Sequence, residues 1–483
     1  MFKEEIAKLL AKELKELKTK PEQIKQQLEI PPLELGDYAF PCFQLAKRLK
    51  QNPIEIAKSL AAKTRPTKNI EKITAVNGYV NFFIKKELFA QKVVSEILSK
   101  KEKFGSSHSG KGERVMIEYS APNTNKPLHL GHLRNDSIGM AISNILAFTG
   151  YKTIKANLLN DRGIHISKVQ LAYQKFRLKQ QKGEKPDHFI GRLYVEFEKR
   201  AKGNEKLADE AKHLLKKWEE KDNATLQTWK KLNELAISGM KETYKKFGSQ
   251  FDVWFKESEF YDKAQPIINE GLKKNIFERA HTGAIIAKLE PELPNKTILR
   301  ADGTSIYITN DLALTKHRFE KYKLQRAIWV VASEQNLYFQ QLFKIFKLLG
   351  FKWADKCKHL SYGLVLLESG KMKSREGTVI DADDLISEIE QLAKKEIQKR
   401  IKEGTIEAVS KAEFEKRAEA IALAAIKFYL LKIEPVKDIL FVPEKAISFE
   451  GETGAYVQYA HTRAASILRK AEKAEKTKTD PWF

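Results

Sequence analysis

The stretch Glu118-Tyr119-Ser120-Ala121-Pro122-Asn123-Thr124-Asn125-Lys126-Pro127-Leu128-His129-Leu130-Gly131-His132 decides how the middle of this 483-residue chain folds. An apolar strand pattern at residues 114–119 precedes it, and a helical apolar stripe follows and stops at Gly150. The free N–H groups at such a helix start attract anions, and Gly131 leaves room for one to approach. His129 and His132, three residues apart on the first turn, can both point at one phosphate.

The segments around this stretch predict a multidomain α/β protein. Residues 1 to about 105 read as an α+β unit with a hairpin around Asn77-Gly78, and a Gly/Ser-rich linker follows at 105–112. Strand patterns at 114–119, 284–287, 305–308 and 327–331 alternate with helices, which is typical of a parallel sheet. Residues of about 170–250 read as a lysine-rich helical insertion, and the chain is almost wholly helical from about residue 382.

The composition favours a polyanionic partner. The formal net charge is +24, with 42% hydrophobic and 31% charged residues, which excludes a disordered chain and makes nucleic acid the leading candidate. Lysine enrichment for solubility or thermal stability is the alternative. Two cysteines cannot form a disulfide framework, so we expect a cytoplasmic protein, and no apolar run or signal peptide predicts a membrane or export.

The two histidines have less specific explanations as well. They could be ordinary helix-start residues, or ligands of a zinc ion. No cysteine or third histidine lies at a fitting spacing nearby, so we predict no metal site.

The long stretch resembles the HIGH signature of class I aminoacyl-tRNA synthetases. Its lead-in, Ser-Ala-Pro-Asn followed by Lys126 and H-x-G-H-L-R, resembles the arginyl-tRNA synthetase family in particular. Further segments that resemble this family follow in the family's order over nearly the whole chain: 160–165, 302–305, 307–311, 332–335 and 370–377.

The resemblance implies a fold and a reaction. It implies a Rossmann-like α/β catalytic domain that ligates L-arginine to tRNA(Arg) through arginyl-adenylate, using ATP with Mg²⁺ and releasing AMP and pyrophosphate. It also implies a monomer. Three domains are expected: an N-terminal tRNA-contacting α+β domain at 1–108, the catalytic domain at 109–381, and a helical anticodon-binding region at 382–483. We expect that last region to be incomplete, because members of the family usually continue beyond it.

The resemblance also implies the residues that bind the nucleotide. His129 and His132 would serve the phosphates of ATP together with Gly131, and Lys126 would add a cation. Residues 371–375 resemble the family's second signature, a basic loop with glycines on both sides. The nucleotide residues implied there are Lys371, Met372, Lys373 and Ser374. Lys373 stands where the family commonly has Ser, and Ser374 where it commonly has the catalytic Lys. Of the lysines, we expect Lys126 and Lys371 to be the catalytic ones.

Arginine recognition requires carboxylates, because a guanidinium is a permanently charged fork of five donors. At the positions that match the family's arginine site stand Glu118, Asn123, Tyr307, Asp311 and Gln335. Tyr307 could instead be a strand aromatic and Asp311 a helix N-cap. The sequence leaves open which carboxylate meets the guanidinium.

Three other interpretations explain the sequence less well. A synthetase for another amino acid lacks the acidic set and the Ser-Ala-Pro-Asn extension. A non-catalytic RNA-binding paralogue would have lost the histidines and lysine that this chain retains. A zinc hydrolase built on the two histidines lacks further ligands.

Overall fold

The computed structural model describes residues 2–367, 370–371, 380–448 and 451–477, and divides into two compact units, Met1–Ser106 and Ser107–Phe483. The first unit is an antiparallel three-stranded sheet in the order β1-β3-β2, covered by helices. Its strands are β1 (Tyr38–Pro41), β2 (Ile70–Val76) and β3 (Tyr79–Ile84), and its helices are α1 (Phe2–Glu13), α2 (Pro21–Gln27), α3 (Phe43–Leu49), α4 (Pro53–Lys63) and α5 (Lys86–Lys100).

The hairpin predicted in this unit is confirmed. Asn77 and Gly78, with φ of 49° and 82°, join β2 to β3, and the twist of such a turn matches that of the strands. Phe40, Val80 and Phe82 of the sheet are buried against Ile6 and Leu10 of α1, so the unit has its own core.

The second unit contains a five-stranded parallel sheet in the order β11-β10-β4-β5-β6. Its strands are β4 (Arg114–Glu118), β5 (Lys152–Leu159), β6 (Val253–Lys256), β10 (Arg326–Ala332) and β11 (Cys357–Tyr362). From β4 the chain runs to β5 and β6 on one side, and later places β10 and β11 on the other. The order of the strands therefore reverses between β4 and β10, where doubly wound sheets bind their ligands. The expected Rossmann-like α/β class is confirmed.

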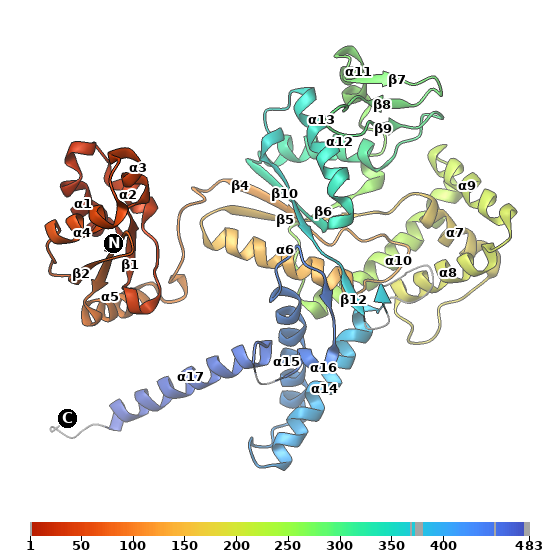
Figure 1. Ribbon diagram of the computed structural model, residues 1–483. Helices are drawn as coiled ribbons and strands as arrows, with labels where there is room; N and C mark the ends of the chain where they lie inside the picture. Colours follow the sequence, from red (N-terminus) through yellow and green to blue (C-terminus); the bar gives the residue numbers. More distant parts are fainter. Residues whose placement is uncertain (1, 368–369, 372–379, 449–450, 478–483) are drawn as a thin grey trace. The chain divides into compact units, whose positions relative to one another are not determined.

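Successive side chains of β4 point to opposite faces of this sheet. Val115 and Ile117 pack with Ile138 of α6 (Leu130–Phe148), whereas Met116 belongs to the core formed with α12 (Tyr307–Tyr322) and α13 (Asn336–Leu349). Figure 1 shows α6 on one side of the sheet and α12 and α13 on the other. Both faces are thus buried, as parallel sheets require.

Between β5 and β10 the chain adds two subdomains. Helices α7 (Ile164–Phe176), α8 (Pro186–Ala201), α9 (Glu205–Glu219) and α10 (Asn223–Phe247) make up the helical insertion. After β6, helix α11 (Gln265–Lys273) precedes an antiparallel sheet of β7 (Phe277–Arg279), β8 (Ile285–Ala287) and β9 (Lys296–Leu299).

Two strand predictions in this region need correction. The strand predicted at 284–287 exists as β8, but it belongs to the antiparallel sheet. The strand predicted at 305–308 is wrong, because α12 begins at Tyr307. Its start is fixed by Thr309, whose hydroxyl accepts from the backbone N–H of Ile306 at 3.0 Å and donates to the carbonyl of Ile298.

The C-terminal part is helical, as expected, apart from one short sheet. Its helices are α14 (Ala382–Lys402), α15 (Lys411–Leu431), α16 (Pro443–Ala446) and α17 (Gly454–Thr477). The short strands are β12 (Val365–Leu367), β13 (Gly370–Lys371) and β14 (Ile439–Leu440). None of the described helices combines the length and the apolar composition that a membrane-spanning segment needs.

Arg134 of α6 ties the catalytic sheet to this C-terminal part. Its buried guanidinium donates to four backbone carbonyls, those of Gly363 (2.6 Å), Leu364 (3.0 Å), Pro435 (3.0 Å) and Lys437 (2.7 Å). No uncharged side chain of this size could satisfy all four.

We predict that Arg134→Met lowers the free energy of unfolding by about 3 kcal/mol or more, because buried acceptors lose charged hydrogen bonds. Arg417→Gln, which removes an exposed pair with Glu413 in α15, should cost no more than about 1 kcal/mol. Urea unfolding of both variants measures the difference, and equal losses would contradict this role of Arg134.

Candidate active site

Three segments of the site follow the carboxyl ends of three adjacent strands. The loop from 119 to 129 follows β4, Asn160 directly follows β5, and Gln335 lies three residues after β10. Because parallel strands end at one edge of the sheet, these segments meet at the point where the strand order reverses.

A cavity of about 560 Å³ opens at this edge. Four of the five predicted arginine ligands line it, namely Asn123, Tyr307, Asp311 and Gln335. Asn160, Lys296 and Tyr338 line it as well. Tyr307 is 58% exposed and also lines a neighbouring cavity of about 220 Å³ with Arg162, His165 and Glu257, so it stands at the border of the two.

Asp311 provides the carboxylate of the larger cavity. It lies in the second turn of α12, so it is not the N-cap of that helix. The hydroxyl of Tyr338, from α13, donates to Asp311 Oδ2. Burial raises the pKa of Asp311 to about 7, and the Tyr338 hydrogen bond opposes that rise. Among the described residues, Tyr338 is the one hydrogen-bond donor to this partly buried carboxylate, which therefore favours a cationic ligand.

Glu118, the fifth predicted arginine ligand, is not among the side chains that line this cavity. It is 6% exposed at the end of β4, and its carboxylate pairs with the buried guanidinium of Arg318 in α12. Arg318 also lies 4.6 Å from the centre of the Phe255 ring. The carboxylate of Glu118 is therefore already paired with a guanidinium of the protein.

His129 and His132 form a tight pair at the start of α6. His129 is the N-cap, and its Nδ1 accepts from the backbone N–H of Gly131 at 3.2 Å. His132 Nδ1 accepts from the backbone N–H of His129 at 3.1 Å, and the ring centres are 3.9 Å apart. Because both Nδ1 atoms are acceptors, each neutral ring carries its proton on Nε2.

The electrostatic surroundings keep these rings neutral. Burial, with a contribution from Lys126, lowers the pKa of His129 to about 3, and burial lowers the pKa of His132 well below its ordinary value. The pair therefore offers two neutral Nε2–H donors rather than two cations.

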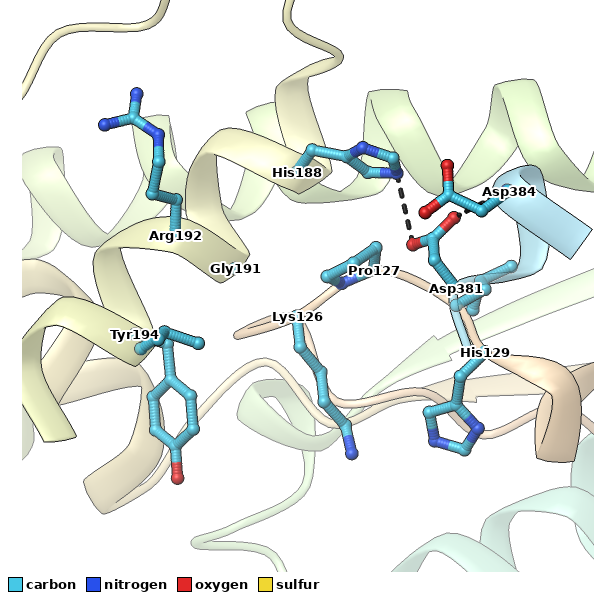
Figure 2. Close-up of a pocket in the computed structure, with 11 residues that line it drawn as sticks. Lys126, Pro127, His129, His188, Gly191, Arg192, Tyr194, Asp381 and Asp384 are labelled. Atoms are coloured by element: carbon cyan, nitrogen blue, oxygen red, sulfur yellow. Dashed lines mark hydrogen bonds and ion pairs between the residues drawn. The ribbon is translucent and has the colours of Figure 1, made fainter. Parts of the chain in front are cut away.

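Lys126 supplies the positive charge beside the histidines. It lines a cavity of about 250 Å³ with His129, and Figure 2 shows the two side chains directed toward the same side. Burial lowers its pKa. Within the described ranges, no hydrogen bond or ion pair reaches its Nζ.

The second signature can be placed only in part. The backbone of Lys371 belongs to β13, whose partner strand is β12. Met372, Lys373 and Ser374 lie outside the described residues.

Sequence reasoning assigned no role to Tyr338, Lys296 or Asn160. Tyr338 stands one helical turn after Gln335, so the spacing of i and i+3 could have indicated a shared face. Asn160 begins one of the segments that carry the family resemblance. Lys296 comes from the antiparallel sheet, and nothing in its local sequence indicates a site.

Comparisons with known proteins agree with this geometry. Residues 93–442 match the family described as tRNA synthetases class I (R), catalytic domain, and residues 4–84 match the arginyl tRNA synthetase N terminal domain. The arginine–tRNA ligase of Treponema denticola is 45% identical over 465 residues, covering 94% of this chain and 78% of that protein. The enzyme of Clostridium perfringens is 37% identical, with 99% and 83% covered.

Among solved structures, Thermus thermophilus arginyl-tRNA synthetase superposes with a TM-score of 0.80 at 26% identity, covering 98% of this chain and 82% of that one. The matching catalytic region spans the histidine pair, the sheet and the cavity that contains Asp311. The chain belongs to the arginyl-tRNA synthetase family of class I, whose reaction is the ATP-dependent ligation of arginine to tRNA.

Proposed function

We propose that the 560 Å³ cavity binds L-arginine and that Asp311, rather than Glu118, accepts the guanidinium. The observation that carries this proposal is the partly buried Asp311 carboxylate, which lines the cavity and has one oxygen hydrogen-bonded to Tyr338. Glu118 already forms an ion pair with Arg318. We therefore assign Glu118 the role of holding the Arg318 side chain beside Asp311.

The remaining polar residues of the cavity suit the rest of the substrate. Asn123 lies in the loop that leads from β4 to His129, and its amide is suited to the α-amino and carboxylate groups of arginine. Gln335, on the same wall as Tyr338, is suited to the guanidinium end. Tyr307, more than half exposed, closes the rim of the cavity.

We further propose that ATP lies against the start of α6. The Nε2–H groups of His129 and His132, the Gly131 backbone and the Lys126 ammonium would hold its phosphates, with Lys371, Met372, Lys373 and Ser374 contributing from the second signature. Charge that develops on the α-phosphate during attack by the arginine carboxylate would meet donors that are already in place. Mg²⁺ would enter with ATP and use mainly phosphate oxygens, because the groups offered by the histidine segment are nitrogen donors.

The acceptor of the second step is tRNA, and we infer its contacts from the two flanking regions. We assign the N-terminal unit, residues 1–108, and the helical region, residues 382–483, to tRNA binding; the net charge of +24 supports a polyanionic partner. We also infer that the protein is a monomer and acts in the cytoplasm. The location is inferred from its two cysteines, Cys42 and Cys357, which are free thiols. Analytical ultracentrifugation measures the oligomeric state.

We predict that Lys126→Ala slows arginyl-adenylate formation about 100- to 1,000-fold while arginine affinity changes little, because a fixed charge near the developing phosphate charge is lost. Single-turnover rates and arginine titration separate the two quantities. Lys212→Ala, at a lysine that is 71% exposed on α9, serves as the control and should behave like the parent. An unchanged rate in Lys126→Ala would refute the assignment.

We predict that kcat/KM for arginine falls as the pH drops through about 7, because protonated Asp311 no longer attracts the guanidinium. The histidine pair should not contribute, since the pKa values of both rings are far below this range.

The variant Tyr338→Phe tests which carboxyl titrates. The Tyr338 hydrogen bond lowers the pKa of Asp311, so its removal should move the midpoint of the profile to higher pH. Glu257, whose pKa burial raises to about 8, lines the neighbouring cavity and would give a midpoint that does not respond to Tyr338→Phe. An unshifted midpoint would therefore assign the titration to another group.

A further inference from the structure

An ion-pair cluster lies outside the arginine cavity, where the start of α8, the C-terminal end of α10 and the start of α14 meet. Lys185 Nζ, just before α8, lies 3.2 Å from Asp187 Oδ2, 2.5 Å from Thr243 Oγ1 and 2.6 Å from Asp383 Oδ2. Thr243 Oγ1 also donates to Asp383 at 3.0 Å. Lys185 thereby connects the helical insertion to the first turn of α14.

His188 of α8 makes a second connection to the same turn. Its Nε2 lies 3.2 Å from Asp381 Oδ2 and 3.5 Å from Asp383 Oδ2, and Figure 2 shows the ring facing Asp381. The closeness of these two carboxylates raises the pKa of His188 to about 10, so the ring is an imidazolium at neutral pH.

The cluster is an ion-pair network rather than a metal centre. Asp187, His188 and Asp383 do have the mutual spacing of metal ligands. The ammonium of Lys185, however, lies within hydrogen-bond distance of both of these carboxylates, and the His188 nitrogen is protonated. Two cations of the protein already balance the carboxylates.

Asp381 connects this cluster to residues 128–130, which include His129. Its Oδ1 caps α14 by accepting from the backbone N–H groups of Asp383 (2.8 Å) and Asp384 (3.2 Å). Its backbone pairs with His129 in an antiparallel bridge: Leu130 N donates to Ile380 O, and Ala382 N to Leu128 O, both at 3.0 Å. The residue that His188 holds is thus the backbone partner of His129.

We infer that His188 and Lys185 are positioning residues for the reaction, which act through Asp381 to fix the segment that carries His129. This inference rests on the proposed nucleotide role of His129. A small displacement of a donor that faces a reacting phosphate slows the chemical step, while the arginine cavity, built from α12 and α13, is left intact.

The test is a double-mutant cycle on His188 and Asp381. His188→Gln removes the cation, and Asp381→Asn removes the charge but keeps an equally good N-cap. We expect each single variant to slow single-turnover adenylate formation about 10- to 100-fold, with little change in KM for arginine. The double variant should be no slower than the slower single variant, and His188→Lys should recover most of the rate.

A matched control is Lys168→Gln, which breaks the pair between Lys168 of α7 and Glu198 of α8, both about one-fifth exposed, without reaching α14. Its rate should equal that of the parent. Thermal unfolding verifies that each variant is folded, and Asp381→Asn with His188→Lys carries the test if His188→Gln does not fold.

Two results would overturn the inference: parental rates in both single variants, or additive losses in the double variant. His129→Ala identifies the source of a failure. If His129→Ala is slow while the single variants are not, only the positioning inference fails. If His129→Ala also has the parental rate, the proposed role of His129 fails.

Discussion

The parallel pairing of β4 with β5 on one side and β10 on the other is the constraint on which the site depends. It brings the ends of three strands, far apart in the sequence, to one edge of the sheet. The loop with Asn123 and His129, the residue Asn160 and the turn with Gln335 all take their places from this pairing. Without it, the cavity that contains Asp311 and the histidine pair would not lie at the same edge of the sheet.

Burial disfavours charge in both parts of the site, but the ionisable groups there differ, and so do the ligands that they suit. At the start of α6, burial keeps two imidazoles neutral, so that they donate hydrogen bonds without adding to the charge of Lys126. In the cavity, burial raises the pKa of Asp311 to about 7. The hydrogen bond from Tyr338 stabilises the charged carboxylate, and a cation would stabilise it further. The cavity with Asp311 suits a guanidinium, and the start of α6 suits phosphates.

The C-terminal helices contribute to this geometry as well. Arg134 binds four carbonyls around the short sheet of β12 and β14, and Asp381 joins α14 to the backbone of His129. Helix α6 is therefore connected to the C-terminal part of the chain in two places, at its start through the Asp381 bridge and in its second turn through Arg134.

Much of this could be predicted from local sequence. The strand–loop–helix pattern around H-x-G-H and the Asn77-Gly78 hairpin depend on neighbouring residues, and both were predicted correctly. The start of α12 was not, because the β-branched and aromatic residues of Ile306-Tyr307-Ile308 favour a strand and only the contacts of Thr309 reveal the helix. The pairing of Glu118 with Arg318 spans 200 residues, and no local pattern indicates it. Tyr338 was overlooked because a tyrosine in an apolar helical stripe reads as core.

Calorimetric titration of Asp311→Asn with arginine and, separately, with ATP checks whether Asp311 recognises the guanidinium while the nucleotide is held elsewhere. We expect arginine affinity to fall by about 2–5 kcal/mol, roughly 30- to 5,000-fold, because the pair between Asp311 and the guanidinium is broken. ATP affinity should stay at the parental value. Parental arginine affinity in this variant, or an equal loss for both ligands, would show that Asp311 does not recognise the guanidinium.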